Sequence, residues 1–75
     1  MPDTLANRLK EKRGEIGLTQ AELAEMVGVT RKTVNTVENG VFIPSALLAI
    51  KLASALNEPV EGLFWLERQA SPTGE

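Results

Sequence analysis

The residues of this chain that are best suited to bind a partner are the cations, amides and hydroxyls of residues 30–39. Within that stretch the first acidic residue is Glu38. Cations, amides and hydroxyls donate hydrogen bonds to phosphates and read base edges in the major groove of DNA. A helix that only faces water usually mixes Glu with Lys, so the stretch indicates a surface that binds nucleic acid. Ordinary solvation remains the alternative for each of these side chains.

Helical geometry divides the same stretch into an inner and an outer face. Val34 and Val37 define the inner direction, because successive helical residues turn by about 100°. Lys32 then projects outward, and Arg31 lies nearer the edge. Arg31 and Lys32 suit O6 and N7 of guanine, and Thr36 suits a thymine methyl group. We therefore predict that base edges are contacted by Arg31, Lys32, Asn35 and Thr36.

The preceding residues predict another helix and a tight turn. Thr19 and Glu22 form the Ser/Thr-x-x-Glu pattern of a capping box, which begins a helix. An apolar stripe continues from there to Val27. Gly28 can adopt a positive φ where this helix ends, and Thr30 can cap the helix that follows. The pattern thus indicates two short helices around one turn.

Residues 19–40 resemble the helix-turn-helix of the Cro/phage-repressor family of transcriptional regulators. The residues that match are Thr19-Gln20 and Leu23-Ala24 in the first helix, Gly28-Val29-Thr30 at the turn, Val34 and Val37 in the second helix, and the closing Glu38-Asn39-Gly40. The likeness extends from about Leu5 to Leu66. It implies an all-α fold, a compact five-helix bundle of the phage-repressor DNA-binding type, in which helices two and three form the helix-turn-helix.

The resemblance also implies a function. It implies a transcriptional regulator that binds double-stranded DNA sequence-specifically as a homodimer, at a palindromic operator, with residues 30–39 in the major groove. The first helix of the motif would lie across the DNA backbone, and Gln20 at its start would donate to a phosphate. The side chains expected to contact phosphates are Gln20, Thr30, Thr33 and Asn39.

Arg13 and Glu38 carry opposite charges toward the predicted core. Arg13 lies near the inner stripe of the N-terminal helix, and Glu38 lies close to the direction of Val34. Two such charges are costly to bury unless they meet. In the family that the chain resembles, an Arg and a Glu at these positions form a salt bridge. We expect the same salt bridge here; the alternative is that both side chains extend into solvent.

The last third of the chain predicts two more helices and an interface. Residues 46–56 form a helix that is apolar nearly all round, so we expect it to be buried on most sides. Residues 60–67 are predicted as the fifth helix, yet one helix cannot point four consecutive large apolar residues at one small core. An exposed apolar surplus usually marks an interface. We therefore predict a two-fold dimer contact that comprises Ile43, Phe64, Trp65 and Leu66.

The predicted boundaries place nearly the whole chain in one unit. The first helix should begin at Asp3 or Thr4 and continue to about Ile16. We expect residues 1–67 to form one DNA-binding domain that includes the C-terminal dimerisation helix. Residues 68–75 should form a flexible tail. Folding of this tail over Trp65 is the alternative to the dimer contact.

Composition argues against several classes of function. The chain of 75 residues has no cysteine and no histidine, and it has no Gly-rich phosphate loop. These absences argue against an enzyme, a metal site, a cofactor site and a small-molecule ligand. The sequence shows no signal peptide and no run long enough to cross a membrane. We therefore expect a cytoplasmic protein associated with a prokaryotic nucleoid.

The net charge of −2, taken alone, argues against nucleic-acid binding. Its distribution is uneven, however: the first forty residues hold six basic and six acidic residues, and the remainder holds two basic and four acidic residues. The predicted binding half is thus neutral. Two alternatives to a simple regulator remain. One is an antitoxin-like autorepressor that also binds a toxin partner, and the other is a helical protein-interaction module without DNA binding.

Overall fold

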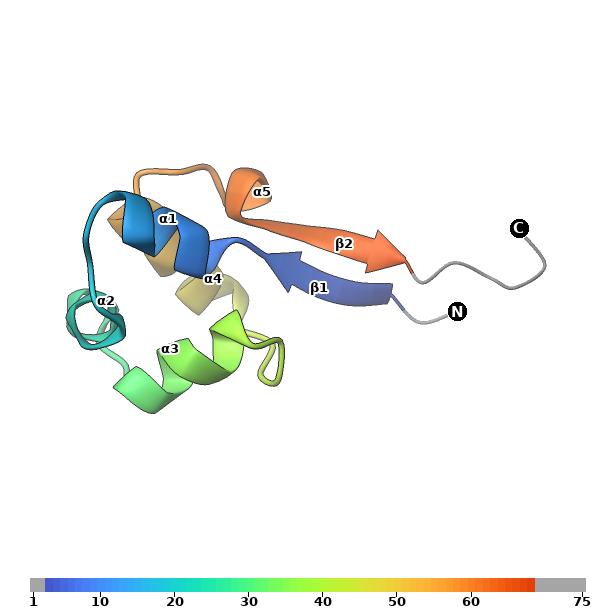
Figure 1. The fold of residues 1–75 in the computed structure, drawn as a ribbon. Helices are drawn as coiled ribbons and strands as arrows, with labels where there is room; N and C mark the ends of the chain where they lie inside the picture. The colour runs from blue at the N-terminus through green and yellow to red at the C-terminus, as the bar shows by residue number, and fades with distance from the viewer. Residues whose placement is uncertain (1–2, 69–75) are drawn as a thin grey trace.

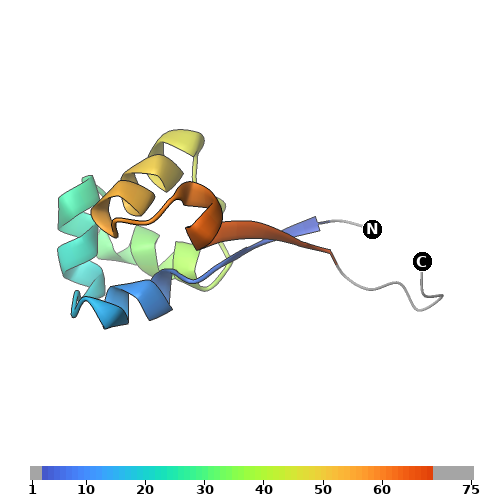
Figure 2. The ribbon, with the colours of Figure 1, turned by 90° about the horizontal axis from the view of Figure 1, so that it is seen from above.

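The two ends of the described chain meet in a pair of strands that extends away from a body of helices (Figure 1). The structure is a computed structural model that describes residues 3–68. Its elements in chain order are β1 (Asp3–Asn7), α1 (Leu9–Glu15), α2 (Gln20–Val27), α3 (Arg31–Glu38), α4 (Ala46–Ala55), α5 (Val60–Leu63) and β2 (Phe64–Arg68). Seen from above, the strands leave one end of the body (Figure 2). The longest dimension is therefore 44 Å, against 20 Å for the other two.

The strands correct the predicted all-α class. β1 and β2 are antiparallel, with Cα partners that run from Asp3 and Arg68 to Asn7 and Phe64. The predicted first helix loses its first residues to β1, and the predicted fifth helix is reduced to the four residues of α5. The fold over residues 3–68 is thus mostly helical, with five helices and one two-stranded sheet.

The run of apolar residues from Leu63 to Leu66 explains why a strand replaces the end of the predicted helix. Successive side chains of a strand point to opposite faces. Phe64 accordingly reaches the core, where it is 6% exposed. Trp65 lies on the other face, and the guanidinium of Arg8 sits 5.1 Å from its ring centre, which is a cation–π contact. Pairing with β1 also satisfies backbone groups that a frayed helix end would leave open.

The core lies among the helices and includes the first residue of β2. Its fully buried members from α2 and α3 are those that the apolar stripes predicted, so the inner faces of both helices are confirmed. The complete set of buried residues is Leu9, Leu23, Ala24, Val27, Val34, Val37, Leu52, Ala53, Leu56, Leu63 and Phe64. Because α2 buries its inner face against α3 and α4, and α3 buries its inner face against α2, their polar faces remain outside.

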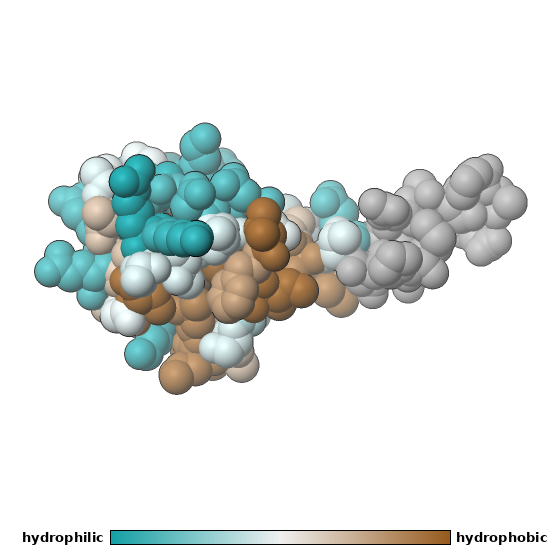
Figure 3. Space-filling view, turned by 90° about the horizontal axis from the view of Figure 1, so that it is seen from below, coloured by the Kyte–Doolittle hydropathy of each residue, from teal (hydrophilic) through white to brown (hydrophobic). Residues whose placement is uncertain are grey.

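α4 is buried on only one side, which corrects the prediction that it is buried on most sides. Leu52 and Ala53 face the core, but Leu47 and Ile50 are 65% and 58% exposed. Apolar residues of the loop after α3 and of β2 are exposed as well. We call this set the apolar surface; it comprises Val41, Phe42, Ile43, Leu47, Ile50 and Leu66. Seen from below, hydrophobic residues gather between the helical body and the base of the strands (Figure 3).

The predicted boundary at residue 67 is not a break in the described structure, because Arg68 is the last residue of β2. Residues 69–75 of the predicted tail lie outside the described residues. Between residues 3 and 68, no helix is long and apolar enough to span a membrane.

Candidate nucleic-acid interface

α2 and α3 are joined by a turn that local hydrogen bonds define at both sides. The capping box of α2 is complete: Thr19 Oγ1 accepts from the Glu22 N–H at 3.0 Å, and Glu22 Oε1 accepts from the Thr19 N–H at 2.9 Å. α2 ends at Gly28, whose φ of 78° lies in the left-handed region. Thr30 Oγ1 then accepts from the Thr33 N–H at 3.1 Å and begins α3. The predicted arrangement of helix, turn and helix is therefore present.

The outward face of α3 brings several predicted contact residues together. Arg31, Lys32 and Asn35 are exposed, and together with Gln20 from the start of α2 they line a shallow depression between the two helices. Among residues 3–68, neither Arg31 nor Lys32 has an ion-pair partner. The depression therefore presents two uncompensated positive charges beside amide groups.

Glu38, the one acidic residue of α3, is withdrawn from this face by an ion pair. Arg13 Nε donates to Glu38 Oε2 at 2.8 Å, and Arg13 Nη2 donates to Glu38 Oε1 at 3.2 Å. The side chains of Arg13 and Glu38 are 15% and 3% exposed, so the expected salt bridge is present and largely buried. Its hydrogen bond to Glu38 raises the pKa of Arg13 above the ordinary value. Arg13 also donates to the Leu18 carbonyl at 2.9 Å, which fixes the guanidinium.

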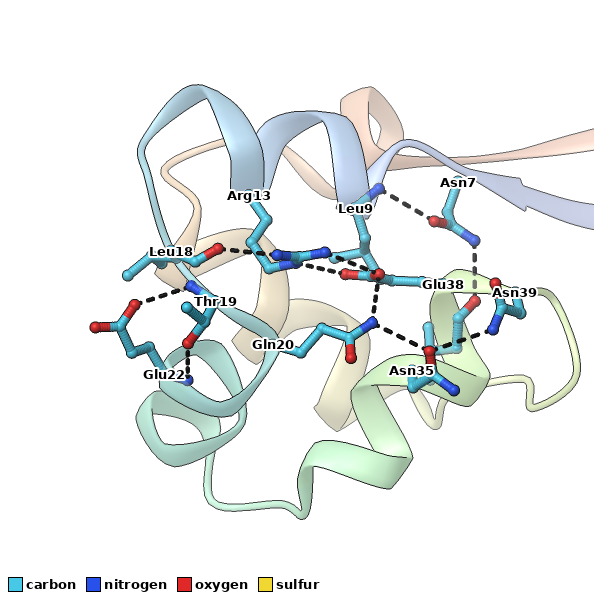
Figure 4. A network of polar contacts seen from close by, with 11 residues as sticks. Asn7, Leu9, Arg13, Leu18, Thr19, Gln20, Glu22, Asn35, Glu38 and Asn39 are labelled. Atoms are coloured by element: carbon cyan, nitrogen blue, oxygen red, sulfur yellow. Dashed lines mark hydrogen bonds and ion pairs between the residues drawn. The ribbon is translucent and has the colours of Figure 1, made fainter.

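Gln20 extends this ion pair to the exposed amides of α3 (Figure 4). Its Nε2 donates to Glu38 Oε1 at 3.0 Å and to Asn35 Oδ1 at 3.1 Å. Asn39 Nδ2 also donates to Asn35 Oδ1, at 3.3 Å. The side chain of Gln20, expected to donate to a phosphate, therefore directs its amide group to two acceptors within the protein. The sequence offered no sign of this bridge, since its partners are 15 and 18 residues away.

The threonines of α3 bond mainly to their own helix. The hydroxyls of Thr30 and Thr33 lie 3.0 Å apart and share one hydrogen bond. Thr36 Oγ1 donates to the Thr33 carbonyl at 2.9 Å. This bond uses the hydroxyl hydrogen of Thr36, so its methyl group and lone pairs are what remain for a partner.

Asn7 connects β1 to the last turn of α3, a role that was not predicted from the sequence. Its Nδ2 donates to the Val37 carbonyl at 3.0 Å, and its Oδ1 accepts from the Leu9 N–H at 3.1 Å. The second bond begins α1, because Arg8 at the N-cap position makes no side-chain capping bond. An Asn two residues before a helix is a known start signal, and it could have located the true start of α1. The bond to Val37 has no signal in the sequence.

The remaining chemistry of this face is that of hydrogen-bond donors. Among residues 3–68, no group of three or more Asp, Glu, His or Cys side chains is arranged to hold a metal ion. The four predicted base-edge residues all lie on α3, and the predicted phosphate contacts lie at the start of α2 and at both ends of α3.

Comparison with known proteins places this arrangement in a family. The family described as helix-turn-helix matches residues 9–63. The chain is 45% identical over 65 residues to the uncharacterized HTH-type transcriptional regulator YgzD of Bacillus subtilis, which covers 87% of this chain and 98% of that protein. It is 47% identical over 64 residues to an uncharacterized HTH-type transcriptional regulator of Methanothermobacter thermautotrophicus, with 84% and 93% covered.

Two solved structures share the fold. The restriction-modification controller protein C.AhdI from Aeromonas hydrophila superimposes with a TM-score of 0.69 at 37% identity, over 72% of this chain and 82% of that chain. A candidate DNA-binding protein from Bacteroides fragilis superimposes with a TM-score of 0.75 at 27% identity, over 83% of this chain and all of that chain.

Proposed function

The chain belongs to the Cro/phage-repressor helix-turn-helix family of transcriptional regulators, which are not enzymes, and from this premise we propose that it binds double-stranded DNA sequence-specifically as a homodimer. The observation that carries the proposal is the outward face of α3. It presents Arg31 and Lys32 without ion-pair partners among the described residues, while the charge of Glu38 is buried against Arg13. A surface with donors and positive charge, and with its acidic group withdrawn, suits a polyanion.

We assign α2 and α3 to the two helices of the motif, with α3 as the recognition helix. Residues 30–39 enter the major groove with the N-terminal end of α3 leading. Arg31 and Lys32 are long enough to reach guanine O6 and N7, and Thr36 directs its methyl group to a thymine methyl. Asn35 contacts a base that lies between that guanine and that thymine.

The phosphate contacts flank these base contacts. Thr30, Thr33 and Asn39 border the groove at the two ends of α3, where hydroxyl and amide groups can donate to phosphates. Gln20 lies at the first residue of α2, where the backbone N–H groups of a first helical turn lack helical partners. We propose that its main chain makes the phosphate contact, because its side-chain amide is engaged by Glu38 and Asn35.

The apolar surface is the proposed contact between two copies. Ile43 and Leu66 of the predicted interface are exposed and belong to it, whereas Trp65 lies on the opposite face of β2 beside Arg8. Phe64 lies beneath this surface in the core and supports it rather than contacting a partner. The surface follows the C-terminal end of α3, so a two-fold axis there would leave both N-terminal ends of α3 free to reach DNA.

This geometry sets the form of the binding site. Two recognition helices about 34 Å apart fit successive major-groove turns on one side of a duplex. The operator is then palindromic, and the protein acts where the chromosome lies, which in a prokaryote is the cytoplasm. The net charge of −2 limits the non-specific attraction of each copy. The cations that contact phosphates should nevertheless make affinity fall as salt rises.

A duplex-binding titration tests the proposal. The full chain is titrated with a random duplex pool at about 50 mM and about 200 mM salt, a range over which counterion release changes affinity strongly. Bound duplexes are then selected over several rounds. We expect binding at low salt and enrichment of a palindromic sequence. The matched control carries Arg31→Ala and Lys32→Ala, which should remove the enrichment. Absence of binding at low salt would overturn the proposal and favour the protein-interaction module.

The apolar surface also suits one variant of this function, in which the protein binds another protein in place of a second copy. A regulator that remains monomeric at micromolar concentration but binds DNA would leave this surface for another protein, as in an antitoxin-like autorepressor that binds a toxin. Sedimentation of the pure chain separates the two forms, because a homodimer doubles the mass without any partner.

A further inference from the structure

The ion pair between Arg13 and Glu38 fixes the direction of every hydrogen bond that leads outward from it. A carboxylate only accepts hydrogen bonds, and a guanidinium only donates them. Glu38 Oε1 therefore requires the NH₂ group of Gln20, and not its carbonyl, at 3.0 Å. The orientation of the Gln20 amide thus follows from the charge of Glu38 and leaves no choice between the two ends of the amide.

The donors around Asn35 determine the orientation of its amide in the same way. The Gln20 NH₂ group has a second hydrogen, which it donates to Asn35 Oδ1 at 3.1 Å. Asn39 Nδ2 approaches the same oxygen at 3.3 Å. The carbonyl oxygen of Asn35 is therefore occupied by two donors, and its NH₂ group points away from them (Figure 4). The exposed part of Asn35 is a donor of two hydrogen bonds and not an acceptor.

We infer that Asn35 reads keto bases, which are guanine through O6 and thymine through O4, and that Gln20 is the residue that positions it. This inference rests on the proposed binding of α3 in the major groove. Recognition of adenine by Asn needs one acceptor and one donor, directed to N6 and N7. The Asn35 oxygen is already engaged, so adenine and cytosine, which present amino groups, are disfavoured at the position that Asn35 contacts.

The surroundings of Asn35 agree with this polarity. Arg31 and Lys32, which line the same depression, are also donors only. The depression therefore combines three donor side chains and offers no acceptor from them. A duplex edge rich in acceptors complements it, and guanine has two acceptors in the major groove.

Substitution of Asn35 by Asp tests the inference, because it inverts the exposed group and keeps the internal bonds. The carboxylate of Asn35→Asp can still accept from Gln20 and Asn39, but its outward atom becomes an acceptor. In a selection from a random duplex pool, the original chain should enrich guanine or thymine at one position of each half-site. The Asn35→Asp chain should favour adenine or cytosine at that position, so the ratio of keto bases to amino bases there should fall by about tenfold.

The matched control for the added negative charge is Asn57→Asp. Asn57 is exposed in the loop after α4, with a φ of 56° that Asp tolerates. This variant should weaken binding slightly at all sequences and leave every base preference unchanged. Thermal unfolding of both variants shows whether they are folded under the conditions of the selection.

A second variant keeps the inference testable if Asn35→Asp does not fold. Gln20→Met removes one of the two donors to Asn35 Oδ1 and leaves the longer bond from Asn39 at 3.3 Å, so the Asn35 amide is held less firmly and can rotate to offer its oxygen. The keto preference at that position should then weaken while the other positions keep theirs, which a purely structural role of Gln20 would not produce. In the free protein, the Gln20 NH₂ protons should exchange with solvent more slowly than those of Asn35 in NMR spectra.

The outcomes separate this inference from the proposed function. Unchanged base preferences in Asn35→Asp and in Gln20→Met would overturn the reading of keto bases while leaving DNA binding intact. Enrichment of adenine by the original chain at the position that responds to residue 35 would also overturn it. Failure of the original chain to enrich any sequence would instead overturn the proposed function itself.

Discussion

Glu38 shows how a single side chain can serve the exposed face of α3 while being buried. Its carboxylate is 3% exposed and is bound by Arg13 and Gln20. The burial removes a negative charge from the proposed DNA-binding face, and the hydrogen bonds offset the desolvation of that charge. The same group connects α1, α2 and α3, so it has both an electrostatic and a structural effect.

Replacement of Arg13 by Ala should destabilise the fold by about 3 kcal/mol, because it leaves the buried carboxylate of Glu38 without its cation. Urea-induced unfolding followed by circular dichroism measures this free energy. The double variant Arg13→Met with Glu38→Gln should recover part of the loss, since no charge is then buried. A loss well below 1 kcal/mol in Arg13→Ala would mean that the pair contributes no more than a surface salt bridge.

Replacement of Lys32 by Ala should lower the affinity for the selected operator by about tenfold, in the range of one lost base-edge contact, and leave the melting temperature unchanged. Lys32 is exposed and makes no ion pair among the described residues, so its removal costs the free protein little. Fluorescence anisotropy with labelled duplex measures the affinity. The control Lys51→Ala removes the same charge from α4 and should retain nearly full affinity; equal losses in both variants would contradict a specific role for Lys32.

At the residue scale, the sequence predicted what depends on type and helical spacing. The salt bridge of Arg13 with Glu38 and the cap at Thr30 followed from such patterns and from the family resemblance, and both are present. The bridge from Gln20 to Asn35 could not be predicted, because it depends on how closely two helices approach each other. Asn7 falls in the same class, since its partner Val37 lies 30 residues away.

At the scale of elements, β1 and its contact with α3 are the main addition to the predicted fold. Asn7 links the end of β1 both to the start of α1 and to the last turn of α3. Thr36, on the same helix, receives the backbone N–H groups of Val41 and Phe42 through its carbonyl. The C-terminal end of α3 is therefore held from two sides, while its N-terminal end remains free for a partner.

Replacement of Asn7 by Ala should destabilise the fold by about 2 kcal/mol, because it removes the cap of α1 and leaves the Val37 carbonyl without its side-chain donor. Chemical denaturation measures the change. Thr4→Ala is the matched control in the same strand: Thr4 bonds the Glu67 carbonyl at an exposed position, and its loss should cost less. An equal cost for both would contradict the view that Asn7 couples the sheet to α3.

Local signals predicted the helices, whereas the strands were not predicted because no local signal marks them. The apolar stripes of α2 and α3 and the caps at Thr19 and Thr30 are local, and these helix starts agree with the structure. β1 pairs with a segment about sixty residues later, and no local pattern encodes such a pairing. The exposed side of α4 was missed for a different reason, since an all-apolar helix looks buried whether its partner is its own core or another protein.

At the scale of the whole molecule, two surfaces with different chemistry lie at the two ends of α3. Its N-terminal end carries the donors of the proposed DNA contact, and the apolar surface follows its C-terminal end. A monomer of this size has a small core, and burial of exposed apolar residues by a second copy would add to its stability. Dimer formation and DNA binding should therefore be coupled through the position of α3.

Replacement of Ile43 by Glu should dissociate the proposed homodimer and lower DNA affinity, while the monomer remains folded. Ile43 is 71% exposed, so the monomer loses little from the change, whereas a charge buried between two copies is costly. Sedimentation velocity at micromolar concentration measures the mass. Ile16→Glu is the control, because Ile16 is also exposed but lies outside the apolar surface; the same mass for both variants and the original chain would argue against this interface.

The pairing of β1 with β2 has a consequence for how the protein is made. β2 is synthesised about sixty residues after β1, so β1 leaves the ribosome well before its partner does. Until then Leu5 and the other emerging apolar residues remain exposed to solvent, and Asn7 has no strand pair to hold it against α3. In a nascent chain the last turn of α3 therefore gains its bond from Asn7 only after the two strands can pair.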